Sequence, residues 1–169
     1  MSEPGEPPYD QAMATRNEVV CGEVQHGTEA YALTVALRDA VLRKPLGLVF
    51  DPQELAQECD SFHLACRLDG NLVGCVVLKP PLDNRHVRLR QMAVAKEYQR
   101  MGVGTRLIAH AEAFLGRRGY RQIILHARET AMAFYERLGY RKEGDRFIEV
   151  TIPHFAMRKE LPACEDPKS

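Results

Sequence analysis

The sequence has no excess of charge of either sign, no paired-cysteine motif and no long apolar run. Lysine plus arginine and aspartate plus glutamate number 23 each. A formal net charge of zero argues against a nucleic-acid-binding surface spread over the whole protein. The five cysteines are odd in number and no two stand in C-x-x-C spacing, so neither a disulfide framework nor a zinc site is indicated. No apolar run approaches the length of a membrane span, and we expect no metal, nucleic-acid or membrane partner.

The length and composition are those of one globular domain. The 169 residues are 45% apolar and 27% charged, the usual balance of a domain with a single core. Residues 1–16, rich in Pro, Gly and Glu, are predicted to be a mobile arm, residues 17–161 the domain, and residues 162–169 a polar tail. The N-terminus also lacks the basic patch and apolar core of a signal peptide. A reducing, cytoplasmic setting is therefore expected, with Cys66 and Cys75 as small core residues.

The spacing of apolar residues predicts strands first, and then strands that alternate with helices. Strand-like runs occupy residues 19–25, 62–68, 72–79, 86–95 and 121–127, with two more between 140 and 161. Helical spacing covers residues 28–45, 51–58, 102–117 and 130–138, the first with the apolar stripe Ala30, Leu33, Leu37, Val41 and Leu42. This order predicts an α/β (α+β) fold, with a mixed central sheet of about six or seven strands flanked by about four helices.

The segment between the strand at 86–95 and the helix at 102–117 is a candidate anion site. It reads Gln-Arg-Met-Gly-Val-Gly over residues 99–104. A helix N-terminus carries unpaired backbone N–H groups and a partial positive charge, so it suits a phosphate or pyrophosphate. Two glycines let the backbone approach the anion closely, although they would equally suit a tight turn. The strand before, the helix after and the polar pair Gln99-Arg100 favour anion binding.

The strand before this turn changes its apolar face partway along. Val87 and Leu89 share one face, but Met92 and Val94 fall on the opposite parity. One extra residue near Arg90-Gln91 would restore a continuous apolar face, so the pattern predicts a β-bulge there. A bulge would leave backbone groups unpaired and free to bind a ligand.

These motifs together resemble the GNAT superfamily of N-acetyltransferases. The turn at 99–104 matches that family's pyrophosphate pattern, Q/R-x-x-G-x-G/A, and Met-Ala-Val at 92–94 matches the strand before it. Ala-Phe-Tyr-Glu-Arg-Leu-Gly-Tyr at 133–140 matches the helix that follows. Leu-His-Ala at 125–127 and Ile-Pro-His at 152–154 further resemble a branch of acyltransferases that includes ElaA-like proteins.

The resemblance implies a cofactor, acetyl-CoA or another acyl-CoA, lying in a V-shaped splay between the strands at 86–95 and 121–127. Its pantetheine would pair with the backbone of Met92, Ala93 and Val94. Its pyrophosphate would meet the turn formed by Gln99, Arg100, Met101, Gly102, Val103, Gly104 and Thr105. The acyl group would pass directly to an amine of a small molecule or of a protein or peptide. The strand amide near Val94 would polarise the thioester carbonyl as an oxyanion hole does, and a homodimer is compatible with the family.

The resemblance also suggests catalytic residues. Tyr135 matches a tyrosine that donates a proton to the departing thiolate, a role that suits a phenol with a pKa near 10. The alternative is an aromatic side chain that merely packs beside Phe134 and Leu138. Many relatives carry a glutamate as general base on the strand before the turn, but residues 87–91 contain no acid. The remaining candidates for the base are His126, Glu149, His154 or a water molecule.

Other interpretations stay open. A GNAT-shaped module that binds CoA or a protein without catalysis is favoured by the missing strand glutamate, whereas the turn and Tyr135 favour the enzyme. A dinucleotide-binding domain is poorly supported, since the glycines do not complete G-x-G-x-x-G. Arg88 and Arg90 would suit an anionic substrate group and Arg128 a phosphate, but exposed arginines are common on strands and at helix starts.

Overall fold

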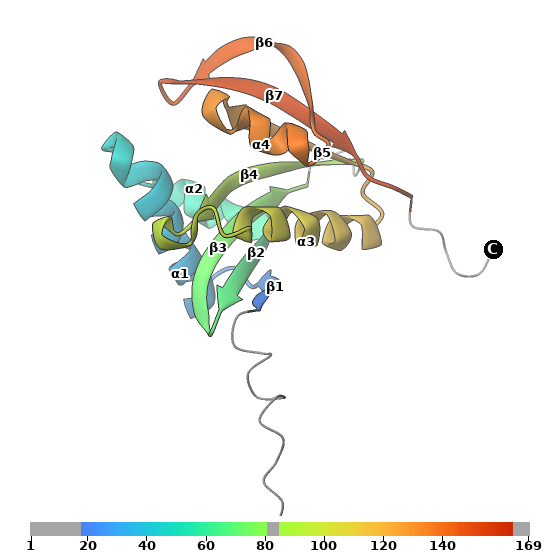
Figure 1. The fold of residues 1–169 in the computed structure, drawn as a ribbon. Coiled ribbons are helices and arrows are strands. Elements are labelled where there is room, and N and C mark those ends of the chain that lie inside the picture. The colour runs from blue at the N-terminus through green and yellow to red at the C-terminus, as the bar shows by residue number, and fades with distance from the viewer. Residues whose placement is uncertain (1–17, 81–84, 164–169) are drawn as a thin grey trace, which may run out of the picture.

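Seven strands form one mixed sheet in the computed structural model, which describes residues 18–80 and 85–163 (Figure 1). Their order across the sheet is β1-β2-β3-β4-β5-β7-β6, and every neighbouring pair is antiparallel except β4 and β5, which are parallel. The strands are β1 Val19–Val24, β2 Phe62–Leu68, β3 Asn71–Lys79, β4 His86–Val94, β5 Gln122–Arg128, β6 Arg141–Glu149 and β7 Ile152–Glu160. The predicted mixed sheet is confirmed. The predicted arm lies outside the described residues, as does most of the predicted tail.

Four α-helices accompany the sheet, as predicted: α1 Glu29–Arg38, α2 Pro52–Gln57, α3 Val103–Arg117 and α4 Met132–Arg137. Local capping explains where two of them begin. The Thr28 side chain accepts a hydrogen bond from the Tyr31 amide, and the Asp51 side chain accepts one from the Gln53 amide. The first helix does not run unbroken to Pro45, because α1 gives way to a π turn at Asp39–Arg43 and a 3₁₀ turn at Lys44–Leu46.

Helices cover both faces of the N-terminal half of the sheet (Figure 1). The middle of β3 is buried on both faces, because α3 packs on one side of the sheet and α1 on the other. The helix expected at 102–117 is confirmed as α3, and its apolar stripe is buried throughout: Val103, Leu107, Ile108, Ala111, Phe114 and Leu115. α4 packs against β5 and β6.

The most deeply buried side of the first helix is polar. The structure buries Tyr31, Thr34 and Arg38. Of the apolar stripe noted in the sequence, Leu33 is 48% exposed and the other members are half-buried. Apolar spacing could not indicate this side of α1, because it carries a polar network. Arg38 is 1% exposed and makes a bidentate ion pair with Glu58, with both N–O distances at 2.8 Å.

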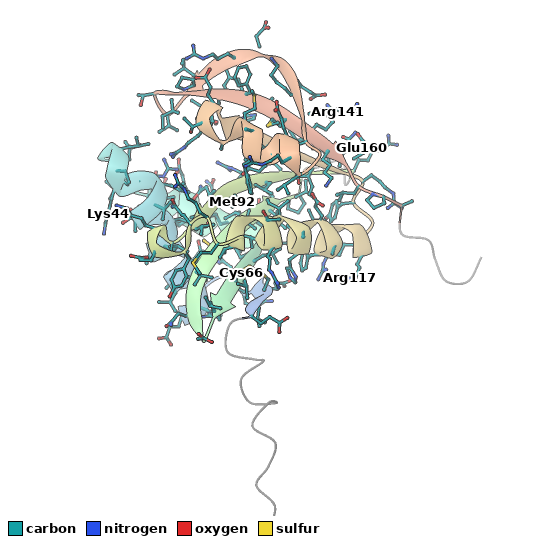
Figure 2. The ribbon with its side chains drawn as sticks, in the orientation of Figure 1. Lys44, Cys66, Met92, Arg117, Arg141 and Glu160 are labelled. Carbon is teal, nitrogen blue, oxygen red and sulfur yellow. A yellow bond between two sulfur atoms is a disulfide. The ribbon has the colours of Figure 1, made fainter. Side chains whose placement is uncertain are left out.

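One cysteine prediction also needs correction. Cys66 is not merely a small core residue, because it forms a disulfide with Cys21 (Figure 2). The antiparallel register of β1 on β2 sets the two residues directly opposite each other. They are 45 positions apart in the sequence, so no local spacing motif could reveal the pair. Cys75 is buried and free, as expected of a core cysteine.

The parallel pair β4–β5 is short, and the two strands then separate. Only His86–Leu89 pair with Gln122–Leu125, and beyond this point β4 stays with β3 while β5 stays with β7. The β3–β4 ladder shifts register between Cys75 and Val77, which face Ala93 and Arg90. Gln91, in the interval, has a φ of +50°. Both the predicted bulge and the predicted splay are confirmed.

Candidate functional site

A cavity of about 270 Å³ opens where β4 and β5 part. Its walls come from β4, the end of β5, α4, the β6–β7 turn and the helical turns that follow α1. Figure 2 shows Met92 on the β4 wall. The four residues that the sequence offered for catalysis all border this cavity: His126, Tyr135, Glu149 and His154.

Strand register explains why three of these residues meet. β5 runs antiparallel to β7 with Arg128 opposite His154. β7 in turn runs antiparallel to β6 with Glu149 opposite Ile152. Side chains alternate between the faces of a strand, so His126 lies on the same face of β5 as Arg128. The β6–β7 hairpin therefore brings a carboxylate and an imidazole to the end of β5 where the cavity opens.

An arginine, two histidines and a carboxylate form one ionisable cluster. Arg88 Nη2 lies 2.8 Å from His126 Nδ1, and Glu149 Oε2 lies 3.2 Å from the same nitrogen. A guanidinium can only donate, so the shorter contact requires a lone pair on Nδ1. Burial, and next the positive charge of Arg88, hold the pKa of His126 below its usual range. The imidazole of His126 is therefore neutral at pH 7, with its proton on Nε2.

His154 has the opposite tautomer. Its Nδ1 lies 2.7 Å from the carbonyl oxygen of Ile152, and a carbonyl can only accept, so Nδ1 carries the proton. In the neutral ring the lone pair is then on Nε2, which lies 3.9 Å from Glu149 Oε2. If this nitrogen takes up a proton, the carboxylate is close enough to stabilise the imidazolium. The arrangement suits a general base.

Tyr135 is both packed and at the edge of the cavity. Its ring makes edge-to-face contacts with Phe134 and Tyr140, at centroid distances of 5.1 and 5.6 Å. Its hydroxyl meets only a weak acceptor, Met92 Sδ, at 4.0 Å. Burial raises the pKa of Tyr135 to about 12, so the phenol stays protonated at any ordinary pH. The hydroxyl is thus a proton donor with no strong protein acceptor among the described residues.

The N-terminus of α3 has the features of an anion site. Gly102, the N-cap, has a φ of +80°, which glycine adopts without strain. No side chain caps the helix and its first turn has no acid. The first helical hydrogen bond there is from the Arg106 amide to the Gly102 carbonyl, so the preceding amides have no helical partner.

Two further contacts tie this turn to the rest of the site. A Cβ at Gly104 would lie 3.2 Å from the Phe134 ring, so glycine here lets α4 approach α3 closely. Gln99 Nε2 donates a hydrogen bond to the Val94 carbonyl at 3.1 Å. The side chain of Gln99 therefore holds the turn against the end of β4. The predicted cofactor residues at 99–105 do not line the cavity, but they lie next to β4 in the chain, and α3 packs against that strand.

Four arginines border the cavity. Three of them, Arg88, Arg90 and Arg128, were candidates from the sequence for binding an anion, and the structure places all three in the lining. Arg43, from the π turn after α1, was missed, because no motif marks it and only the fold brings it opposite β4. The contact of Arg88 with His126 was missed as well, because it depends on the parallel register of β4 and β5.

Two negative findings apply to the described ranges, 18–80 and 85–163. No group of three or more His, Cys, Asp or Glu residues is placed to hold a metal ion. No helix there has the length and apolar character needed to cross a membrane.

Comparison with known sequences gives consistent matches. A family model described as the acetyltransferase (GNAT) family matches residues 31–140. The uncharacterized N-acetyltransferase YitI of Bacillus subtilis is 34% identical over 107 residues, covering 60% of this chain and 72% of that protein. Probable N-acetyltransferase 14 of Xenopus tropicalis is 34% identical over 77 residues, covering 44% of this chain and 37% of that protein. The chain spans half or less of the length of this protein and of two further Bacillus subtilis relatives.

Solved structures share the fold. A candidate N-acetyltransferase from Lactobacillus plantarum has a TM-score of 0.75 and 26% identity, covering 86% of this chain and all of that one. ElaA of Escherichia coli has a TM-score of 0.72 at 18% identity, covering 85% and 100%. An aminoglycoside 6'-N-acetyltransferase complexed with coenzyme A has a TM-score of 0.72 at 18% identity, covering 87% and 99%. The last two similarities are to the fold alone.

Proposed function

Because the chain belongs to the acetyltransferase (GNAT) family, we propose that it is an acyl-CoA-dependent N-acyltransferase that moves an acetyl group from acetyl-CoA directly to a primary amine. One observation carries the proposal. The opening between β4 and β5 adjoins both an uncapped helix N-terminus and a cluster of proton-transfer groups. A thioester held in that opening would have a phosphate site on one side and the acceptor cavity on the other.

The residues present fit the cofactor. The unpaired edge of β4 at Met92, Ala93 and Val94 would pair with the amides of pantetheine, much as an added strand pairs with a sheet edge. The turn from Gln99 to Thr105 would hold the pyrophosphate through backbone amides and the helix dipole. Support comes from the coenzyme A complex of the aminoglycoside 6'-N-acetyltransferase, which has the same fold.

The residues that border the cavity support a proposal for the proton transfers. We place His154 as the general base, since its Nε2 carries a lone pair and Glu149 lies 3.9 Å away to stabilise the cation that forms. His126, held by Arg88, would offer its Nε2–H as a donor to the acceptor or to a water. Tyr135 would donate its phenolic proton as the CoA thiolate leaves, because Tyr135 borders the cavity and its hydroxyl has only the weak acceptor Met92 Sδ among the described residues.

A thermal-shift experiment tests the cofactor site. At about a hundred times its dissociation constant, acetyl-CoA should stabilise the protein by about 2.7 kcal/mol, which raises the melting temperature by roughly 5–10 °C in a domain of this size. Gly102→Glu should abolish the shift, because it puts a negative charge at the anion site. Gly119→Glu is the matched control. Gly119 lies beyond the other end of α3, has a φ of +86° and similarly open surroundings, so it carries the same backbone strain without touching the site.

The two outcomes separate the candidate functions. No shift in the wild type would reject the cofactor proposal. A shift without release of the CoA thiol in the presence of any amine would instead favour the alternative, a GNAT-shaped module that binds CoA without catalysis. The absence of an acid from Val87 to Gln91 is the observation that favours that alternative.

We also propose a cytoplasmic location, which the redox state of Cys21 and Cys66 tests. In a reducing compartment their disulfide should be open. Alkylation in denaturant immediately after cell lysis exposes the buried thiols and, followed by mass measurement, should then modify all five cysteines. Modification of three would place the protein in an oxidising compartment.

A further inference from the structure

The charges around the cavity are unbalanced. Four arginines border it, Arg43, Arg88, Arg90 and Arg128, whereas Glu149 is the one carboxylate among the described lining residues. That carboxylate is already shared, at 3.6 Å from Arg88, 3.2 Å from His126 and 3.9 Å from His154. The cavity lining therefore carries more positive than negative charge. Arg90 also borders a second hollow that contains Glu54, Glu58 and Asp60, but among the described residues Arg43 and Arg128 share no hollow with a carboxylate other than Glu149.

The arginines have few partners of their own. Among the described residues, no ion pair or hydrogen bond is formed by the side chain of Arg90 or Arg128. The Arg43 guanidinium lies over the Phe50 ring at 4.7 Å, and its Nε has no hydrogen-bond acceptor. The Nε of Arg88 likewise has none. A cluster of like charges with one shared counter-ion opposes folding, so an anionic ligand would stabilise this part of the protein.

These arginines surround the opening from separate elements. Arg88 and Arg90 stand on β4, Arg128 at the end of β5 and Arg43 on the turn after α1. The proposed pyrophosphate site is elsewhere, because no residue from Gln99 to Thr105 lines the cavity. The cofactor phosphates therefore do not account for this charge, and the group that enters from the acceptor side remains.

We propose that the acceptor amine carries an anionic group, a carboxylate or a phosphate, which the cavity arginines bind while the amine faces His154. This inference rests on the proposed function and specifies its substrate class. Polyamines and other polycations are excluded by the same field, because they would bring more positive charge beside four guanidinium groups. A volume of about 270 Å³, part of it taken by the acetyl group, suits a molecule of amino-acid size.

The positive field also helps the chemistry. An amine attacks only when it is unprotonated, and nearby cations lower the pKa of an ammonium group. Burial, and next the charge of Arg90, lower the pKa of the Arg88 guanidinium, and both causes would act in the same direction on an ammonium group bound beside it. An amine bound there would lose its proton to His154 more readily than in water.

The first test compares acceptors in pairs that differ only in the anion. Rates of CoA thiol release are measured for L-amino acids and for the amines that lack only the α-carboxylate, such as L-tyrosine and tyramine or L-lysine and cadaverine. Aminoethyl phosphate and ethanolamine form the phosphate pair, which distinguishes the two anions. We expect kcat/KM to be at least tenfold higher for the anionic member of a pair. Equal or higher values for the plain amines would overturn the inference and leave the acetyltransferase proposal intact.

The second test measures the binding of anions without turnover. Glutarate and inorganic phosphate are titrated calorimetrically into the wild type and into Arg90→Gln, Arg43→Gln and Arg128→Gln, all saturated with CoA. At least one anion should bind, and its affinity should fall at least fivefold in two of these variants. Arg117→Gln is the control, because Arg117 ends α3 far from the cavity (Figure 2). Affinities that are equal in all five proteins, or absent in all, would reject the anion site even where acetyl-CoA binds normally.

Discussion

Replacing Arg38 with methionine should strongly destabilise the protein. Arg38 donates to both oxygens of Glu58 and, through Nη1, to Gln91 Oε1, each at 2.8 Å. Tyr31 donates to the same carboxylate at 2.7 Å. Methionine keeps the apolar stem and volume of the side chain, so the change removes the charge and its hydrogen bonds while filling the space. Glu58, whose side chain is 14% exposed, would be left as a charge with one donor.

The size of the effect follows from the burial. Breaking a buried ion pair by removing one partner costs about 3–5 kcal/mol, because the other charge is left uncompensated. For a domain of this length that corresponds to a fall in melting temperature of roughly 6–20 °C. Thermal unfolding followed by circular dichroism measures it. The double variant R38M/E58L removes both charges and should recover at least half of the loss.

The double-variant cycle also shows what would refute this reasoning. If R38M melts within about 2 °C of the wild type, the ion pair contributes little and the network is incidental. If R38M/E58L is as destabilised as the sum of its single variants, the two side chains do not interact energetically. Gln91 adds a functional consequence. It is the bulge residue with a φ of +50°, so R38M should also raise the KM for acetyl-CoA by loosening β4 beside the cofactor.

Three further predictions follow from ionisable groups of the cavity and of the core. Tyr135→Phe should lower kcat by at least about tenfold, as loss of a general acid does. The thermal shift caused by acetyl-CoA should be retained. Unchanged turnover would reject the acid role. Arg88→Met should raise the pKa of His126 toward about 6.5, because it removes the second-largest of the three causes that depress it, after burial and ahead of the charge of His154. NMR titration of the ring protons checks this. Burial lowers the pKa of His63. Just below pH 6.5 the folded protein therefore binds fewer protons than the unfolded chain. The melting temperature should be constant above that pH and should fall as the pH drops below it. Arg38 and Tyr31 lower the pKa of Glu58 despite its burial, so the melting temperature should decline a second time below about pH 4.5. A melting temperature that stays constant from pH 8 to 4 would contradict both expected declines.

Local signals in the sequence were sufficient for much of this fold. The turn at 99–104 and the helix after it could be predicted because glycine positions and helical periodicity depend on neighbours in the chain. The bulge at Gln91 could be predicted from the parity of apolar residues along one strand. The positions of the candidate catalytic residues around one cavity could be expected only through the resemblance to a family.

Features set by strand register could not be predicted. Cys21 faces Cys66 only because β1 and β2 pair in one particular antiparallel register. His154 gained a defined tautomer from the Ile152 carbonyl at the start of β7, which no residue pattern reveals. The burial of Arg38 could not be predicted either, since a buried ion pair looks like an exposed face in sequence.

The short parallel seam between β4 and β5 has a consequence for self-association. Where the strands part, each presents an unpaired edge inside the molecule, and a free edge can pair with a strand from another chain. Natural edges are protected by bulges and by charged side chains; here the bulge at Gln91 interrupts β4, and Arg90 and Arg128 place positive charge beside the gap. A cofactor lying between the strands would cover the same edges. The ligand-free protein is therefore the form that should aggregate first on heating, and acetyl-CoA should delay the rise in light scattering at concentrations that saturate the site.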